Sequence, residues 1–300
     1  VTLITDYFGW TKFTLLFSQE IYNEAQSGRG AGILGGETNF TAARLSTLLP
    51  FAIYLMLKKN ALKYSSFWAI PLVLLILLGV ILTGSRMGYL AVAQIVLVLV
   101  FYEVGTSSWT GKLAAVLTVV VLMGIGAYSF TLLKNQSKAL LRLQSLGSIQ
   151  DLSVANLDNS EFDDSLLNRF ILFWIGVHII QTHPLMGVGI GNAKYIPPRY
   201  FPFESQIKYL HNTYLEFGAE NGLPALLGFL LFLGYLLVRL GGRGWRSRDD
   251  FRFYLALGLY ILLFNWFFLT DLYNKLFWVV FLPVTIRFLQ ADRGSHDVSR

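Results

Sequence analysis

The feature that most constrains the fold is a series of apolar runs long enough to cross a lipid bilayer. A spanning helix needs about 20 mostly apolar residues, because the hydrocarbon layer is about 30 Å thick. Seven runs are predicted as spans: 39–57, 66–83, 87–104, 113–133, 212–238, 253–270 and 275–290. The expected fold is therefore all-α, a polytopic membrane helical bundle, because a helix pairs its backbone polar groups within the segment.

Composition narrows the class of protein further. Hydrophobic residues make up 54% of the 300 residues and charged residues 14%, against about 25% charged in soluble domains. Such a chain has too little polar surface to cover a soluble globule, and its hydrophobicity excludes a disordered protein. The chain contains no cysteine, which excludes a disulfide framework, a thiolate metal site and a cysteine nucleophile.

The positions of lysine and arginine predict how the chain is oriented in the membrane. Basic residues gather in three predicted loops and toward the end of the chain, and all of these fall on one side when the spans alternate: Lys58, Lys59, Lys63, Lys112, Arg239, Arg243, Arg246, Arg248, Arg252, Arg287, Arg293 and Arg300. By the positive-inside rule that side is cytoplasmic. The net charge of +6 is then explained without a nucleic-acid partner.

The whole chain, 1–300, is interpreted as a single integral membrane domain with two outward parts. Residues 1–38 are expected to face outward or lie at the interface, because Asp6 and Lys12 interrupt their apolar pattern. Residues 134–211 form a large loop on the outer face. We expect most candidate functional residues on this face, where positive charge is not required by topology.

Two local patterns stand out within the outer loop. Apolar residues recur at helical spacing over 166–181, which predicts an amphipathic helix on the bilayer or on the bundle: Leu167, Phe170, Ile171, Trp174 and Val177. The run Pro184-Leu185-Met186-Gly187-Val188-Gly189-Ile190-Gly191-Asn192 imitates a dinucleotide fingerprint, but no strand precedes it. A tight turn with close backbone approach is the better interpretation.

Two arginines on the outer face are candidates for binding an anion. Arg86 follows Thr83-Gly84-Ser85 between the second and third spans, where glycine breaks the helix and Ser85 can cap the next one. Arg169 opens the helix of the outer loop. An interfacial arginine that reaches water and a solvated arginine are the alternatives, although ionisable groups near the membrane core are costly and point to function.

A histidine and two carboxylates mark the return of the outer loop to the membrane. His211 and Asn212 precede the fifth span, and an imidazole there suits proton transfer near neutral pH. Glu216 and Glu220 lie four residues apart on one helical face, and we expect arginine partners for them. Arg29, Asn39 and Arg44 add polar groups near the outer end of the first span, and Asp271 adds one between the last two.

In this order the residues resemble the O-antigen ligase and polymerase family of bacterial membrane glycosyltransferases. The similar segments are Arg169 with Trp174, Pro184 to Gly189, His211-Asn212-Thr213-Tyr214-Leu215, Glu220-Asn221-Gly222-Leu223, Thr83 to Arg86, and the stretch from Arg29 to Asn39. Members of the family usually have more spans, so the resemblance implies the C-terminal part of a longer protein. Glu216 stands where many members carry a neutral residue.

The resemblance implies a GT-C-like membrane fold that transfers a glycan from an undecaprenyl-diphosphate carrier to an acceptor hydroxyl. The site would face the periplasm at the bacterial inner membrane, and transfer would invert the anomeric centre without metal or other cofactor. His211 would be the catalytic base, with Arg86, Arg169 and Arg29 on the donor diphosphate. Asn39, Asn212, Glu216 and Glu220 would be further substrate-binding residues.

Several alternatives stay open from the sequence. The acceptor is a lipid A core sugar in ligases, another glycan in polymerases and a protein hydroxyl in related enzymes. A small-anion transporter or channel would also use arginines, although its site is expected near the midplane. A membrane scaffold whose loop binds a partner is the third alternative.

Overall fold

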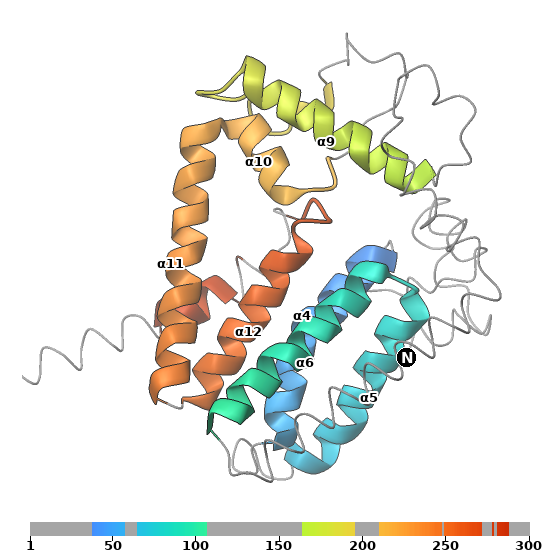
Figure 1. The fold of residues 1–300 in the computed structure, drawn as a ribbon, viewed down its shortest axis with the longest axis vertical. Helices are drawn as coiled ribbons and strands as arrows, with labels where there is room; N and C mark the ends of the chain where they lie inside the picture. The colour runs from blue at the N-terminus through green and yellow to red at the C-terminus, as the bar shows by residue number, and fades with distance from the viewer. Residues whose placement is uncertain are drawn as a thin grey trace, which may run out of the picture.

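The structure, a computed structural model, describes residues 38–57, 65–106, 164–195, 210–247, 249–271, 278 and 281–287. Every element in the described part of the chain that spans more than a turn is a helix, which confirms the all-α class (Figure 1). The helices are α4 (Thr38–Leu57), α5 (Ser65–Thr83), α6 (Arg86–Thr106), α9 (Asp164–Thr182), α10 (Thr213–Asn221), α11 (Leu223–Ser247) and α12 (Asp250–Asn265), with a short 3-10 helix η4 (Ala193–Tyr195).

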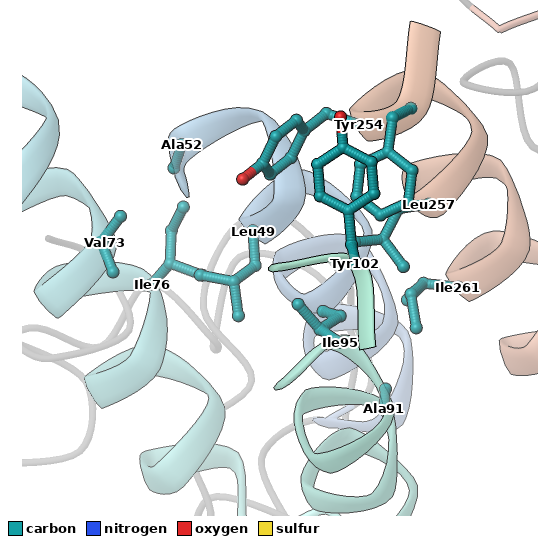
Figure 2. Close-up of a cluster of buried hydrophobic side chains, with 11 residues drawn as sticks. Leu49, Ala52, Val73, Ile76, Ala91, Ile95, Tyr102, Tyr254, Leu257 and Ile261 are labelled. Atoms are coloured by element: carbon teal, nitrogen blue, oxygen red, sulfur yellow. The ribbon is translucent and has the colours of Figure 1, made fainter. Parts of the chain in front are cut away.

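Helices α4, α5, α6 and α12 pack around a shared apolar core. Helix α4 contacts the other three, and Figure 2 shows side chains from all four helices pointing toward one another. The buried members are Leu49, Ala52, Val73, Ile76, Ala91, Ile95, Tyr102, Phe253, Tyr254, Leu257 and Ile261. The core follows from helices with apolar residues at every turn, because any face of such a helix can be buried.

Helix α11 packs along α12 with one stripe and leaves its other faces open. Phe229, Leu233, Leu236 and Leu240 are buried in the cluster shared with α12. Most of the remaining apolar side chains of α11, including Leu227 and Leu231, are exposed. A helix that is apolar all round but buried on one stripe requires an apolar solvent on the others.

Two described helices, Thr38–Leu57 and Leu223–Arg246, are long and apolar enough to cross a membrane. The apolar parts of α5 and α6 (Trp68–Thr83 and Arg86–Tyr102) are shorter. The first three predicted spans thus correspond to helices, and the fourth, 113–133, lies outside the described residues. The number of seven spans stays a prediction.

The predicted fifth span, 212–238, is wrong. It consists of two helices, α10 and α11, which are separated by Gly222. Gly222 has a positive φ of 85°, and a Cβ at this position would meet the backbone of Leu185. The helix is therefore interrupted where the backbone of Leu185 fills the space that a side chain at position 222 would take. Glu216 and Glu220 belong to a nine-residue helix rather than to a span.

Basic residues gather at the end of the bundle remote from α10, where α11 meets α12 (Figure 1). Arg239, Arg243 and Arg246 lie on the last turns of α11, and Arg252 pairs with Asp249 at 2.7 Å beside the first turn of α12. Here Tyr102 of α6 stacks on Phe253 and donates to Asp250 at 2.9 Å. Part of the basic group used to predict orientation therefore lies together at this end, and the assignment of this end to the cytoplasm stays a prediction.

Two glycines near the end of α11 test the close contact between α11 and α12. A Cβ on Gly244 would lie 2.6 Å from the backbone nitrogen of Phe253, whereas one on Gly242 would meet nothing within 4 Å. We expect Gly244→Ala to cost about 1–3 kcal/mol, because the helices must separate, and Gly242→Ala to be neutral or slightly stabilising. Thermal unfolding in detergent measures both, and equal midpoints would contradict the contact.

Candidate functional site

His211 lies in a short loop that enters α10 with an unusual backbone. Among the described residues it is the one non-glycine residue with positive φ, at 51°. Such a conformation costs free energy in a residue with a Cβ, and it persists only where the surroundings determine it. Asn212 follows as the N-cap of α10, because its side-chain oxygen accepts from the backbone N–H of Leu215 at 2.9 Å.

Thr213 and Glu216 fasten this loop to the segment that follows α12. The Thr213 hydroxyl donates to the carbonyl of Leu269 at 2.6 Å and accepts from the backbone N–H of Asp271 at 3.0 Å. Glu216 accepts at one oxygen, Oε2, from the N–H of Leu210 at 3.1 Å and from the hydroxyl of Thr270 at 2.7 Å. His211 is thus held between two residues, 210 and 213, that are each fixed by hydrogen bonds.

The glycine-rich run 184–192 forms a tight turn against the other end of α10, which confirms the interpretation from sequence. The N–H groups of Val188 and Gly189 donate to the carbonyls of Ala219 and Glu220 at 3.0 and 2.9 Å. Gly187 has a φ of 62°, and a Cβ there would collide with the backbone of Glu220. The turn therefore requires glycine for both conformation and close approach.

The carboxylate of Glu220 accepts a hydrogen bond from a backbone amide of this turn. Its Oε1 accepts from the N–H of Gly191 at 2.8 Å, and the side chain is buried. Successive glycine amides can form an anion site, but here the protein's own carboxylate takes that role at Gly191. Both glutamates accept hydrogen bonds from backbone amides, a type of partner that residue chemistry alone does not predict.

Helix α9 packs on α10 through a face other than the predicted one. Its buried residues are Leu172, Ile175 and Ile179, which form a cluster with Leu210 and Ala219. Trp174 of the predicted stripe is 49% exposed, so this residue does not pack on α10. The predicted alternative, that the stripe lies on the bilayer, stays a prediction. The helix is apolar on more than one face, and what packs beside it decides which face is buried. Figure 1 shows α9 lying across the end of the bundle beside α10.

Arg169, on the first half of α9, acts electrostatically on His211. Burial lowers the pKa of His211 from its ordinary value of 6.5, and the positive charge of Arg169 lowers it further. Both causes disfavour the imidazolium form. The imidazole of His211 is therefore predominantly neutral at pH 7 and has an unprotonated ring nitrogen.

Ser85 joins the start of α6, where Arg86 lies, to Asn39 of α4. The Ser85 hydroxyl donates to Oδ1 of Asn39 at 2.9 Å and accepts from the N–H of Gly88 at 3.5 Å, as expected of a cap. Gly84 has a φ of 61° and ends the preceding helix. Arg86 begins α6 with an exposed side chain.

The two groups of residues lie at the same end of the bundle. Met87, next to Arg86, is buried in a cluster with Leu269, and the carbonyl of Leu269 accepts the Thr213 hydroxyl. A path through residues 87, 269 and 213 thus connects the start of α6, where Arg86 lies, with the loop of His211. The predicted residues Arg86, Asn39, Arg169, His211, Asn212, Glu216 and Glu220 all lie on elements that meet at this end, while Arg29 lies outside the described residues.

Sequence reasoning missed the residues that connect these elements. Thr213 and Thr270 are buried and hydrogen-bonded. Their only sequence signal is a hydroxyl beside the end of an apolar run, which is too common to single them out. Within the described ranges no three His, Asp or Glu side chains are grouped as a metal site would require.

Comparison with known proteins identifies the family. A family model described as O-Antigen ligase matches residues 71–230, more than half of the chain. The chain belongs to the O-antigen ligase family. The match includes α6, α9, α10 and most of α5, together with the start of α11. No curated protein matches the chain.

Membership of the O-antigen ligase family gives the general activity and environment. The activity is of the O-antigen ligase or polymerase type, which makes the chain an enzyme of the glycosyltransferase kind in a membrane-embedded family. The family match begins inside α5 and ends inside α11, so it includes both Arg86 and the whole segment 164–221.

Two substitutions of Glu216 separate an anchoring role from a role of its negative charge. Because a single oxygen accepts both hydrogen bonds, the amide oxygen of Glu216→Gln can replace it. Glu216→Ala leaves buried donors at Leu210 and Thr270 and is expected to cost about 1–3 kcal/mol. Thermal unfolding and glycan transfer measure the two variants. Equal loss in Glu216→Gln would contradict simple anchoring.

Proposed function

We propose that this chain transfers a glycan from an undecaprenyl-diphosphate-linked donor to an acceptor hydroxyl at the periplasmic face of the bacterial inner membrane. The observation that most supports this proposal is the relation between His211 and Arg169. The positive charge of Arg169 on α9 acts on the imidazole of His211, which precedes α10, and the two helices pack together. Transfer is metal-independent and inverting. Family membership supports the reaction type.

His211 acts as the general base in this proposal. The acceptor oxygen attacks the anomeric carbon of the donor, and its proton passes to the unprotonated ring nitrogen of His211. A lowered pKa keeps that nitrogen free at neutral pH, and general base catalysis is typically worth about 10²–10⁴-fold in rate. The strained backbone at His211 is consistent with a functional role, because strain is retained where it orients a side chain for its function.

Arginines bind the leaving group. The bond between the anomeric carbon and the phosphate oxygen breaks, and the diphosphate gathers negative charge as it leaves. Guanidinium groups pair with phosphate oxygens bidentately and remain charged at any working pH. Arg169 and Arg86 take this role, together with Arg29. Such pairs gain strength where the membrane edge lowers the dielectric constant.

Inversion requires the acceptor and the departing diphosphate on opposite faces of the sugar. His211 and Arg169 belong to the side formed by α9 and α10, whereas Arg86 belongs to the junction of α4 and α6. The donor can therefore be held from two sides at one end of the bundle. Asn39, through its contact with Ser85, positions the start of α6, and Asn212 positions His211 as the cap of α10.

Single substitutions test the three main assignments. Arg86→Ala, Arg169→Ala and His211→Ala should each reduce transfer from a lipid-linked donor in proteoliposomes, by about 10²–10⁴-fold for the histidine. His183→Ala and Arg246→Ala are matched controls, because both side chains are exposed and neither has a role in the mechanism. Normal transfer in all three site variants, at unchanged protein level, would reject the proposal.

The pH dependence of transfer tests His211 through Arg169. For the native chain, kcat/KM should fall on acidification with an apparent pKa below 6.5, because burial and then Arg169 disfavour the imidazolium. In Arg169→Gln one cause is removed, so the midpoint of the remaining activity should move up toward 6.5. The quantity to compare is the midpoint of the pH profile, because Arg169→Gln is also expected to lower the maximal activity. An unchanged midpoint would argue against His211 as the base.

A further inference from the structure

The glycine-rich turn presents a group of exposed apolar side chains that the mechanism does not use. Leu185 is 74% exposed, Met186 85% and Ile190 71%. The stretch 182–193 contains no lysine, arginine, aspartate or glutamate. Three large apolar side chains that extend from one uncharged turn are unfavourable in water and favourable in the boundary region of a bilayer.

This turn is joined to the first residue of α11. The N–H of Leu223 donates to the carbonyl of Pro184 at 2.7 Å, and Gly222 packs against the backbone of Leu185. The exposed apolar face of α11 begins at the same level with Leu223 and continues with Leu227. The three side chains of the turn therefore extend an apolar surface that already belongs to a helix of spanning length.

The length of α11 fixes the depth of the turn. A helix rises about 1.5 Å per residue, so Leu223 lies roughly 30 Å along the axis from Arg243, which is close to the thickness of the hydrocarbon layer. With Arg243 and Arg246 at one membrane surface, Leu223 and the turn lie at the other.

We propose that Leu185, Met186 and Ile190 insert among the phospholipid acyl chains just below the headgroups. The turn is then a membrane anchor for the outer segment that contains α9. Because Glu220 binds this turn at Gly189 and Gly191, the anchor also sets the height of α10 relative to the bilayer. The inference depends on the membrane embedding of the family and not on the proposed reaction.

Spin-label accessibility tests the anchor directly, and the absence of cysteine supplies the background. Met186→Cys and Ile190→Cys, each in the full chain, are labelled with a nitroxide in phosphatidylethanolamine–phosphatidylglycerol vesicles. Leu227→Cys is the lipid reference and Gln181→Cys, an exposed polar site, is the aqueous one. We expect higher oxygen accessibility and lower nickel-chelate accessibility at 186 and 190 than at 181, as at 227.

Two results would overturn the anchor. Nickel-chelate accessibility at 186 and 190 equal to that at 181 would place the turn in water. Low accessibility to both reagents would mean that protein, either a second copy or another partner, covers the turn. Glycan transfer is not measured in this experiment. A chain that does not transfer glycan can still have the anchor, and a chain without the anchor can still transfer glycan.

Discussion

The position of His211 depends on how Thr213 is held at the end of α12. One hydroxyl donates to Leu269 and accepts from Asp271, and the backbone N–H of Thr213 donates to Trp266. These bonds join residues more than fifty positions apart in the chain. Because Asn265, just before the same turn, donates to the carbonyl of Ala43 on α4, the loop of His211 is connected through α12 to the centre of the bundle.

Hydrogen bonds between side chains join α4 to α6 and α12 at this end, whereas at the other end the hydrogen bond of Tyr102 to Asp250 is accompanied by aromatic stacking. Asn39 binds Ser85 and Asn265 binds Ser46 near the site, while Tyr102 stacks on Phe253 at a centroid distance of 3.7 Å at the far end. Hydrogen bonds between membrane helices average about 0.6 kcal/mol each. Their contribution is therefore mainly directional: they fix which residues face one another, as a site for a charged substrate requires.

Hydropathy alone predicts α4, α5 and α6 nearly to their ends, because length and apolar content are local properties. The break at Gly222 is not local, since its positive φ is imposed by the backbone of Leu185. The buried face of α9 could not be predicted either, because Trp174 and Ile175 are equally suited to burial and α10 decides between them.

For the site, residue chemistry singles out His211, Arg86 and Arg169 from the sequence, since ionisable groups are rare beside apolar runs. Their connection could not be inferred. It depends on Leu269, an ordinary apolar residue that shares a buried cluster with Met87 and accepts a hydrogen bond from Thr213 at its carbonyl. A backbone acceptor has no signature in sequence, so the geometry of the site comes only from the fold.

The two apolar faces of α9 limit how the outer segment can open for a bulky sugar chain. Leu172, Ile175 and Ile179 face α10, and Phe173 and Trp174 are exposed on the outside. Separating α9 from α10 would expose these three buried side chains to water, at a free-energy cost of about 1.5–3 kcal/mol for each. Burial of this row therefore favours α9 and α10 moving together rather than apart.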